Sequence, residues 1–576
     1  MWSKVNSIFR SLQQKQARIL PYTAIGVTVF IFNLIAVFGL KNLLHDDPAG
    51  YYEVLRGEGF HRNMLEHNLI APFTGWASRT VMTFSPQSAR ALYILVLMIP
   101  IACCLYYLYH AKFGFSPVAA YAAAVVPLIL PRQHEIPTGI SDSYILWGFL
   151  FVLLSMLLSF RYLDTDSHRK WSFLLAAAGF YLISTQFMEL ALFMFPPLAL
   201  AVLGFRKQRR ERILLFSAFL LVALTKVTQV LLSPRKKIFS VAVIDTIGRI
   251  GKFFDNSLAF PPLKTGYTVS IVVIIIGAAF FLCARKGSST AGGRHIFSHF
   301  TKGMAAVAFY GFFLCWVIST IFFFLVMTPN FPSRYSFISS FGLNAVFLFS
   351  LSVLLAGLFP GKKRVVTFIL LGSVAITGIY RFFSLKNSYV KLNSLHTIIE
   401  RQLGSKKLPP DSQAVIVLPP NFGFFAGGWK RSSGFLEFAL KRKDVTGLIG
   451  KKDSSVYYNF DSHFDPRVRA FLPRFDMTGL DFGKPVFLFL CDLEQAKLIQ
   501  LQYALQWLGE SKDAVWKILK ADKNNGRMSV MTAGFGMQDY MRTVKKMGSA
   551  GIRQTDILWG GPPTNAERQR LRLGEN

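Results

Sequence analysis

Charged residues are scarce in this chain of 576 residues, and acidic residues are the scarcest of them. Asp, Glu, Lys and Arg together make up 16% of the sequence, whereas about 25% is usual in a soluble domain. Long hydrophobic runs alternate with short charged ones up to about residue 385, and Phe alone contributes 56 residues. This pattern excludes a soluble globular protein and an intrinsically disordered chain.

Cysteine is rare as well, and several common catalytic motifs are missing. Four of the five cysteines lie in apolar runs and one lies in the C-terminal tail, so the sequence implies no disulfide framework. The chain has no Gly-x-x-x-x-Gly-Lys-Ser/Thr phosphate loop, no Gly-x-Ser-x-Gly elbow and no Cys-x-x-Cys pair. We therefore expect neither a phosphate-loop nucleotidase nor a serine hydrolase of the elbow type.

Basic residues outnumber acidic ones, with 64 Lys and Arg against 31 Asp and Glu, and the formal net charge is +33. A basic chain often binds nucleic acid. Here the cytoplasmic loops of a membrane protein explain the excess better, because such loops collect Lys and Arg next to anionic headgroups. We expect membrane lipids as partners and no nucleic acid.

The hydropathy pattern predicts an α-helical polytopic membrane protein with about eleven transmembrane helices. Basic residues in most of the short loops place the N-terminus in the cytoplasm, and the loop at 233–266 is the exception. The first apolar segment lacks a small-residue cleavage site, so we expect a retained span. The predicted spans are 20–42, 91–110, 115–131, 143–160, 172–186, 187–205, 213–232, 267–284, 304–327, 336–358 and 364–385. Polar residues at 184–186 and 189 predict a turn between the fifth and sixth.

The chain divides into two domains on this pattern, a transmembrane domain at 1–385 and a C-terminal domain at 386–576. An odd number of spans makes the C-terminal domain extracytoplasmic. Its strand-like runs at 413–418 and 486–491 and helix-like runs at 396–402 and 494–507 predict an α/β fold. From residue 560 onward we expect a flexible polar end.

The first extracytoplasmic loop, at 43–90, holds the most promising chemistry. Asp46 and Asp47 are adjacent carboxylates that follow the first span, a setting that suits a general base or a metal ligand. A helix cap or a solvated loop start would also explain the pair. Further along, His61 and His67 lie in an amphipathic stretch that is typical of interfacial helices, and plain interfacial packing is the alternative function of this stretch.

The other outer loops carry further candidates. His134 and Glu135 lie in the second loop, and Glu189 lies at an outer turn between two helices. A solvated loop is the simpler explanation for the first two, and an ionisable residue at membrane level is a functional candidate by default. Arg334 and Tyr335 open the span at 336–358. Arginine suits bidentate phosphate binding, although both residues would also serve as interface anchors.

Taken together, the acidic pair after the first span, the long outer loop, the Arg-Tyr pair and the outer C-terminal domain form a familiar pattern. The sequence resembles the GT-C class of membrane glycosyltransferases, of the protein O-mannosyltransferase and lipid A aminoarabinose transferase type, over about residues 1–385. The tail lacks a clear Trp-Trp-Asp acceptor motif, which argues against an oligosaccharyltransferase.

The resemblance implies a hexosyl or pentosyl transferase that uses a polyprenyl-phosphate-linked sugar donor and inverts the anomeric centre. Asp46 or Asp47 would be the base, and Arg334 would bind the donor phosphate with help from Tyr335. The acceptor would be an extracytoplasmic glycan, lipid or protein. Some members of the class need a divalent cation such as Mg²⁺ or Mn²⁺ and others need none.

By the same resemblance, five further residues would line the cavity of the site. They are His134, Glu135, Glu189, His61 and His67. We expect the protein in the bacterial inner membrane, working in assembly of the cell envelope. The alternatives are a transporter or flippase of lipid-linked glycans, a membrane-anchored scaffold of envelope assembly, and a polysaccharide polymerase or ligase of another fold.

Overall fold

The computed structural model divides the chain into two compact units. Unit 1 comprises residues 1–39, 60–81 and 87–385, and unit 2 comprises residues 40–59, 82–86 and 386–576. Residues 40–59 and 82–86, which the sequence pattern places in the predicted domain at 1–385, group in the structure with residues 386–576. The structure describes residues 19–34, 38, 51–52, 56, 85–130, 143–166, 168–187, 189–204, 209–231, 253–254, 257, 265–286, 302–327, 336–405, 408, 410–418, 429–451, 486–492, 496–500, 521–522 and 527–528.

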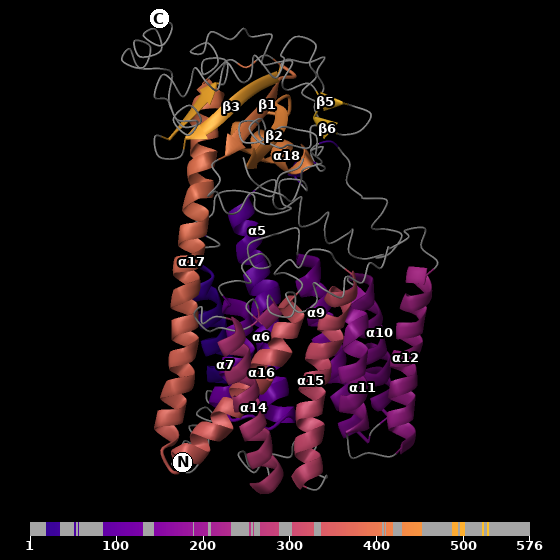
Figure 1. Cartoon of the computed structure of the whole chain (residues 1–576). Helices are drawn as coiled ribbons and strands as arrows, with labels where there is room; N and C mark the ends of the chain where they lie inside the picture. The colour runs from indigo at the N-terminus through magenta and orange to yellow at the C-terminus, as the bar shows by residue number, and fades with distance from the viewer. Residues whose placement is uncertain are drawn as a thin grey trace, which may run out of the picture. The chain divides into compact units, whose positions relative to one another are not determined.

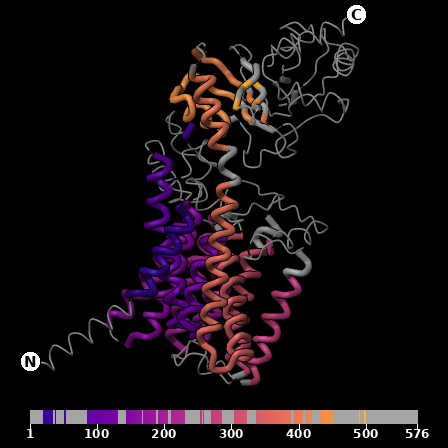
Figure 2. The backbone as a smooth tube through the Cα atoms, turned by 90° about the vertical axis from the view of Figure 1, so that its left-hand side faces the viewer, coloured from indigo at the N-terminus to yellow at the C-terminus, as the bar shows by residue number. Residues whose placement is uncertain are grey.

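Unit 1 is a bundle of apolar helices that run along one common direction (Figures 1 and 2). The first helix among the described residues is Ile19–Phe32, here called the first helix. A long helical stretch at Pro86–Lys112 contains α5 (Pro86–Tyr93), α6 (Ile99–Tyr107) and two π-helical turns. The helices that follow are α7 (Pro117–Val125), α9 (Ser143–Asp164), α10 (Lys170–Phe187), α11 (Phe195–Leu203), α12 (Arg209–Leu231), α14 (Thr265–Lys286), α15 (Lys302–Met327), α16 (Phe337–Leu358) and α17 (Lys363–Ser405).

The apolar helices identify a multi-pass membrane protein. Within the described residues, five helices are long and apolar enough to cross a bilayer. They are Pro86–Lys112, Ser143–Asp164, Gly303–Ile321, Phe337–Leu358 and Lys363–Lys386. Each of the eleven predicted segments contains helical residues, but the number of spans and their orientation stay predictions.

Aromatic side chains fill the centre of the bundle, which explains the high Phe content. Phe115 stacks on Tyr109 with ring centroids 5.1 Å apart and contacts Phe349 at 4.8 Å. Trp316 of α15 is buried and donates its indole N–H to the carbonyl of Ile338 in α16 at 3.1 Å. The indole N–H is therefore satisfied inside the apolar interior, where an unpaired donor would be costly.

The predicted turn between the fifth and sixth spans lies slightly later than the sequence suggested. Helix α10 continues through Ser184 and Gln186 to Phe187, and both polar residues are buried. A 3₁₀ helix, η6 (Glu189–Met194), then leads into α11. Pro196 and Pro197 at the start of α11 fit its first turn, where a proline needs no N–H partner.

Unit 2 contains a four-stranded mixed sheet with strand order β2-β1-β3-β4. The strands are β1 (Gln413–Leu418), β2 (Thr446–Lys451), β3 (Val486–Asp492) and β4 (Lys497–Gln500). Strand β1 pairs in parallel with β2 and β3, and β4 is antiparallel to β3. Helix α18 (Trp429–Leu440) connects β1 to β2, as a parallel pair requires. A short hairpin pairs β5 (Ala521–Asp522) with β6 (Arg527–Met528).

The strands predicted at 413–418 and 486–491 are present as β1 and β3. The helix predicted at 396–402 is the last part of α17. The helix predicted at 494–507 is wrong over Lys497–Gln500, which forms β4. Pairing with the free edge of β3 overrides the local helical preference there. Gln402 supports this strand by accepting from the N–H of Leu498 at 2.6 Å.

Candidate functional site

Most of the site residues predicted from the sequence lie outside the described residues. This holds for the two predicted bases, the two phosphate-binding candidates and four of the five candidate cavity residues, namely Asp46, Asp47, Arg334, Tyr335, His61, His67, His134 and Glu135. Glu189 is described through its backbone, which opens η6. The structure instead describes the chain segments next to these residues.

Arg381 is a fully buried guanidinium in the apolar part of α17. It donates from Nη1 to the carbonyl of Leu130 and from Nη2 to Oδ1 of Asn33, both at 2.8 Å. Asn33 is itself fixed, because its Nδ2 donates to the carbonyl of Val29 at 2.8 Å. A charged group in an apolar bundle is costly unless it is hydrogen-bonded, and these contacts meet part of that need.

The two acceptors of Arg381 precede two predicted outer loops in the sequence, Asn33 from within the predicted span at 20–42 and Leu130 from the end of the predicted span at 115–131. Asn33 follows the first helix, Ile19–Phe32, and precedes the loop of Asp46 and Asp47 in the sequence. Leu130 follows the 3₁₀ helix η4 (Val126–Ile129) and is four residues before His134. One guanidinium therefore links the two helical segments that precede, in the sequence, the predicted loops with the candidate site residues.

A glycine allows the helices to meet at this point. A Cβ built on Gly378 of α17 would lie 2.3 Å from the ring of Phe32. Only a glycine fits so close to that ring, and Gly378 lies nearly one turn before Arg381. Thr28 and Tyr121 share a hydrogen bond of 2.6 Å between their hydroxyl groups, which ties the first helix to α7 as well.

A second buried cation lies in α12. The side chain of Lys226 is fully buried and donates to Oε1 of Gln229 at 3.3 Å. Gln186 lies three residues before Glu189, the first residue of η6, and donates to the same oxygen at 3.4 Å. This polar group joins α10 and α12 at the ends of the helices that the sequence predicts to face outward.

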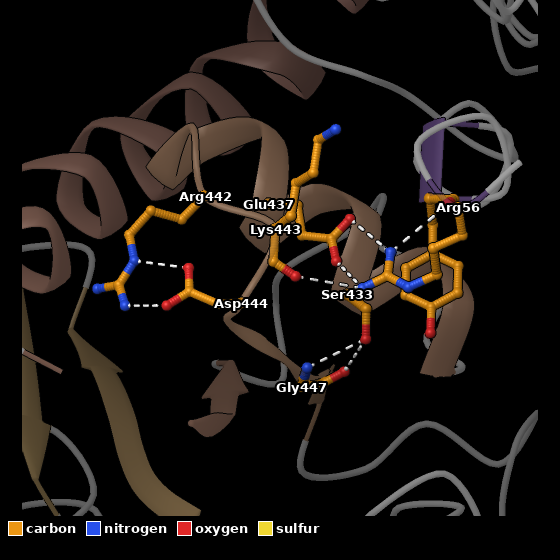
Figure 3. Close-up of polar contacts among 8 residues, drawn as sticks. Arg56, Ser433, Glu437, Arg442, Lys443, Asp444 and Gly447 are labelled. Atoms are coloured by element: carbon orange, nitrogen blue, oxygen red, sulfur yellow. Dashed lines mark hydrogen bonds and ion pairs between the residues drawn. The ribbon is translucent and has the colours of Figure 1, made fainter. Parts of the chain in front are cut away.

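Part of the first outer loop is described in unit 2 (Figure 3). Arg56 forms a two-pronged ion pair with the carboxylate of Glu437 in α18, with Nη1 3.0 Å from Oε2 and Nη2 bonded to Oε1. The guanidinium lies over the ring of Tyr52 at 3.6 Å from its centroid, and it also donates to the carbonyl of Lys443 at 3.3 Å. The side chain of Glu437 is fully buried.

Two opposing effects set the proton affinity of this carboxyl group. Burial raises the pKa of Glu437 above its ordinary value of 4.5, and the adjacent Arg56 lowers it by a smaller amount. Tyr51 contacts Phe438 edge to face at 5.4 Å, and its pKa is raised by burial and by the nearby Glu437. Tyr51 and Arg56 thus both contact side chains of α18.

Sequence reasoning did not single out Arg381, Asn33, Arg56 or Glu437. For Arg381 a signal existed, since an arginine inside the apolar run at 364–385 has to find partners within the bundle. Nothing local marks Glu437 as the partner of Arg56, which is 381 residues away. Among the described residues, no three His, Cys, Asp or Glu side chains come together as a metal site.

Comparison with known proteins gives a distant structural likeness. No protein-family model and no curated protein matches the chain. It is similar to the archaeal oligosaccharyltransferase AglB from Archaeoglobus fulgidus in complex with an inhibitory peptide and a dolichol-phosphate, with a TM-score of 0.41 and 12% identity over 75% of this chain and 64% of that one. The apo form of the Archaeoglobus fulgidus oligosaccharyltransferase gives a TM-score of 0.42 and 13% identity over 76% and 65%.

The chain spans less than two thirds of the length of either of these structures. With TM-scores this low, the functional argument rests on the residues of this chain.

Proposed function

We propose that this protein is a membrane glycosyltransferase that moves a hexosyl or pentosyl group from a polyprenyl-phosphate-linked donor to an extracytoplasmic acceptor. The observation that carries the proposal is the contact of Arg381 with both Asn33 and Leu130. It links the two helical segments that precede, in the sequence, two loops whose carboxylate and imidazole groups suit acid-base chemistry. Loops held at their bases by a rigid scaffold are where catalytic groups are commonly placed.

The proposed reaction is a single displacement with inversion. The acceptor hydroxyl oxygen attacks the anomeric carbon, and its proton passes to the carboxylate of Asp46 or Asp47. The bond between the anomeric carbon and the phosphate oxygen breaks, and the electron pair leaves with the lipid phosphate. Arg334 would neutralise the charge on that phosphate, with Tyr335 shaping the pocket. A phosphate is a good leaving group, so activation of the hydroxyl is the step that needs a base.

The remaining candidates have supporting roles in this proposal. His134, Glu135, Glu189, His61 and His67 would line the cavity that receives the sugar and the acceptor. A divalent cation such as Mg²⁺ or Mn²⁺ could share with Arg334 the neutralisation of the charge on the phosphate. The acceptor is a glycan, lipid or protein outside the cytoplasm. The protein would lie in the bacterial inner membrane with its N-terminus in the cytoplasm and unit 2 outside.

A deletion strain tests the proposal through the mass profile of its surface glycans and glycosylated lipids. We expect the deletion to lose one defined sugar and the wild-type gene to restore it. Asp46→Asn or Asp47→Asn, and Arg334→Ala, should fail to restore it at matched membrane levels. Adding a chelator to a membrane assay with labelled lipid-linked sugar separates metal-dependent transfer, which the chelator stops, from transfer that uses arginine alone. An unchanged glycan profile in the deletion would refute the proposal.

Transport of lipid-linked glycans is the second candidate, and the buried cation Lys226 favours it. Ionisable residues inside a span commonly mark a substrate path. Transport predicts that Lys226→Gln abolishes movement of the glycan, whereas Asp46→Asn and Asp47→Asn are tolerated. Glycosyl transfer predicts that one of the two aspartate variants abolishes the product, so the same strain separates the two functions.

A further inference from the structure

The contact between the first outer loop and α18 suggests a role for the C-terminal unit. We infer that Arg56 and Glu437 form a clamp that positions the first outer loop for glycosyl transfer, which makes the α/β unit a positioning element of the reaction. The inference rests on the proposed function for its catalytic consequence. The clamp itself is a matter of contacts within unit 2 and is tested independently of activity.

Arg56 and Glu437 form a bidentate ion pair, which is more specific than a single contact between surface charges. Both terminal nitrogens of Arg56 reach the carboxylate of Glu437, one oxygen each. The face of the guanidinium lies on Tyr52 at 3.6 Å, and its remaining donor capacity reaches the carbonyl of Lys443. Lysine could not reproduce this arrangement, because it lacks a planar group with several fixed donors.

Because the pair is buried, breaking it would be energetically costly, and it can therefore hold the loop against α18. The Glu437 side chain is fully buried, and that of Arg56 is 26% exposed. If the arginine leaves, a buried carboxylate stays behind without its cation, which is strongly unfavourable. The loop can therefore detach from α18 only at a large cost. Tyr51 adds an aromatic contact with Phe438 beside the ion pair.

The clamp lies close to the predicted bases along the chain. Tyr51 is four residues after Asp47 and Arg56 is nine residues after it. A chain of four residues spans at most about 14 Å, so fixing Tyr51 limits the volume that the Asp47 backbone can explore. Catalytic groups need to be held within a fraction of an ångström of their productive position. Loss of the clamp should therefore reduce the rate of transfer more than the affinity for either substrate.

A matched control pair lies in the same unit. Arg442 and Asp444 form an ion pair through Nε at 3.0 Å and Nη2 at 2.5 Å (Figure 3). Their side chains are 32% and 38% exposed, so this pair should contribute little. Arg442→Gln makes the same change of residue as Arg56→Gln, at a site with no contact to the first outer loop among the described residues.

Hydrogen-deuterium exchange on the full-length protein in lipid nanodiscs tests the clamp directly. In Arg56→Gln we expect amides in peptides covering residues 51–56 to exchange at least about tenfold faster than in the wild type. Glu437→Gln should act in the same direction, and Arg442→Gln should change nothing. Equal exchange in the wild type and Arg56→Gln would overturn the clamp.

Kinetics with a labelled polyprenyl-phosphate sugar then test its consequence. We expect Arg56→Gln and Glu437→Gln to lower kcat roughly 10- to 100-fold with KM for the donor unchanged. The double variant should be less impaired than Arg56→Gln, because no buried charge is left unpaired. A loss confined to Arg56→Gln, with a raised KM, would assign Arg56 to substrate binding and overturn the inference.

The two proposals fail in different ways. If the wild type transfers no sugar, the proposed function is refuted, and the exchange experiment still tests the clamp. If exchange rises in Arg56→Gln while kcat stays at the wild-type level, the clamp exists but has no positioning role, and the inference is refuted while the function stands.

Discussion

Arg381 of α17 donates a 2.8 Å hydrogen bond to Asn33, a residue 348 positions earlier in the chain. The same guanidinium binds the carbonyl of Leu130. It is fully buried, so its contacts decide whether the bundle tolerates the charge. These three residues connect α17 with the first helix and η4, the two helices that precede the candidate loops in the sequence.

Replacing Arg381 should therefore damage both stability and function. Arg381→Met removes two hydrogen bonds from a charged donor, and each is worth about 1.5–3 kcal/mol. Arg381→Lys should recover part of the loss, since one ammonium cannot hold both acceptors in the same geometry. Thermal unfolding in detergent and the glycan profile would measure the two effects.

Two further variants control this prediction. Arg364 lies at the exposed start of the same helix, and Arg364→Met should leave the unfolding temperature close to that of the wild type. Asn33→Asp keeps an oxygen acceptor opposite Arg381 and should retain activity, whereas Asn33→Leu should not. Full activity in both Arg381→Met and Asn33→Leu would show that these contacts do not organise the loops.

Gly378 should be intolerant of even a methyl group. An added Cβ would lie 2.3–2.4 Å from three ring atoms of Phe32, so the ring or the helix has to move. We expect Gly378→Ala to lower the unfolding temperature and to weaken the contact between Arg381 and Asn33. Overpacking of this kind costs about 1–3 kcal/mol.

Gly372 supplies the matched control in the same helix, because a Cβ there meets nothing within 4 Å. Gly372→Ala should be neutral or mildly stabilising, since alanine is the better helix former. Unfolding of both variants in one detergent would compare them. Equal unfolding temperatures for the two variants would contradict the tight contact at Gly378.

The ion pair of unit 2 predicts a pH-dependent effect of Arg56→Gln. Burial raises the pKa of Glu437 above 4.5, so between its unfolded and folded values the folded protein binds more protons than the unfolded one. Stability then falls as pH rises through that window. Arg56 lowers the pKa of Glu437. Its removal therefore raises this pKa further and extends the window to higher pH. The variant should therefore lose more stability at about pH 7 than at about pH 5.

Thermal unfolding of the wild type and Arg56→Gln at both pH values would measure this difference. The double variant Arg56→Gln/Glu437→Gln has no carboxyl group at this position and should lose the pH-dependent part. Asp444 should not contribute, because its pKa is lowered by the hydrogen bonds of Arg442, which stay in place in every variant. A larger destabilisation at the lower pH would contradict the assignment to Glu437.

The helices of unit 1 were predictable because a span of about 20 apolar residues is a strong local signal. Strands β1 and β3 were predictable for a similar reason, as continuous apolar runs between turn residues. Strand β4 was not, because residues 497–500 become a strand only through pairing with β3. Local propensity alone favours a helix there.

The candidate site shows the same division between local and distant information. Adjacent carboxylates such as Asp46 and Asp47 stand out in the sequence. The partners of Arg381 and Arg56 do not, since 348 and 381 residues separate each pair. An arginine in an apolar run predicts that a partner exists, but only the fold identifies it. Residues that position a site are therefore harder to find than residues that carry its chemistry.

The carboxylate chemistry of the first outer loop gives the most direct prediction for transfer. If one of the two aspartates is the base, its Asn variant should lower kcat by about 10²–10⁴-fold, the usual contribution of a general base. The other Asn variant should have a much smaller effect. Asp→Glu at the essential position should retain some activity, because the basic group remains but its reach changes.

Replacing Arg334 should change KM for the donor as well as kcat, whereas replacing the base should change mainly kcat. Arg334→Ala should raise KM for the lipid-linked donor as well as lower kcat, since a phosphate contact is present in the bound substrate and strengthens as charge develops on the leaving group. Arg334→Lys should recover part of the affinity for the donor. The glycan profile and a membrane assay with labelled lipid-linked sugar would separate the roles. If both aspartate variants and Arg334→Ala transfer sugar at the wild-type rate, the base and the phosphate ligand lie elsewhere in the chain, and Lys226 becomes the first residue to test.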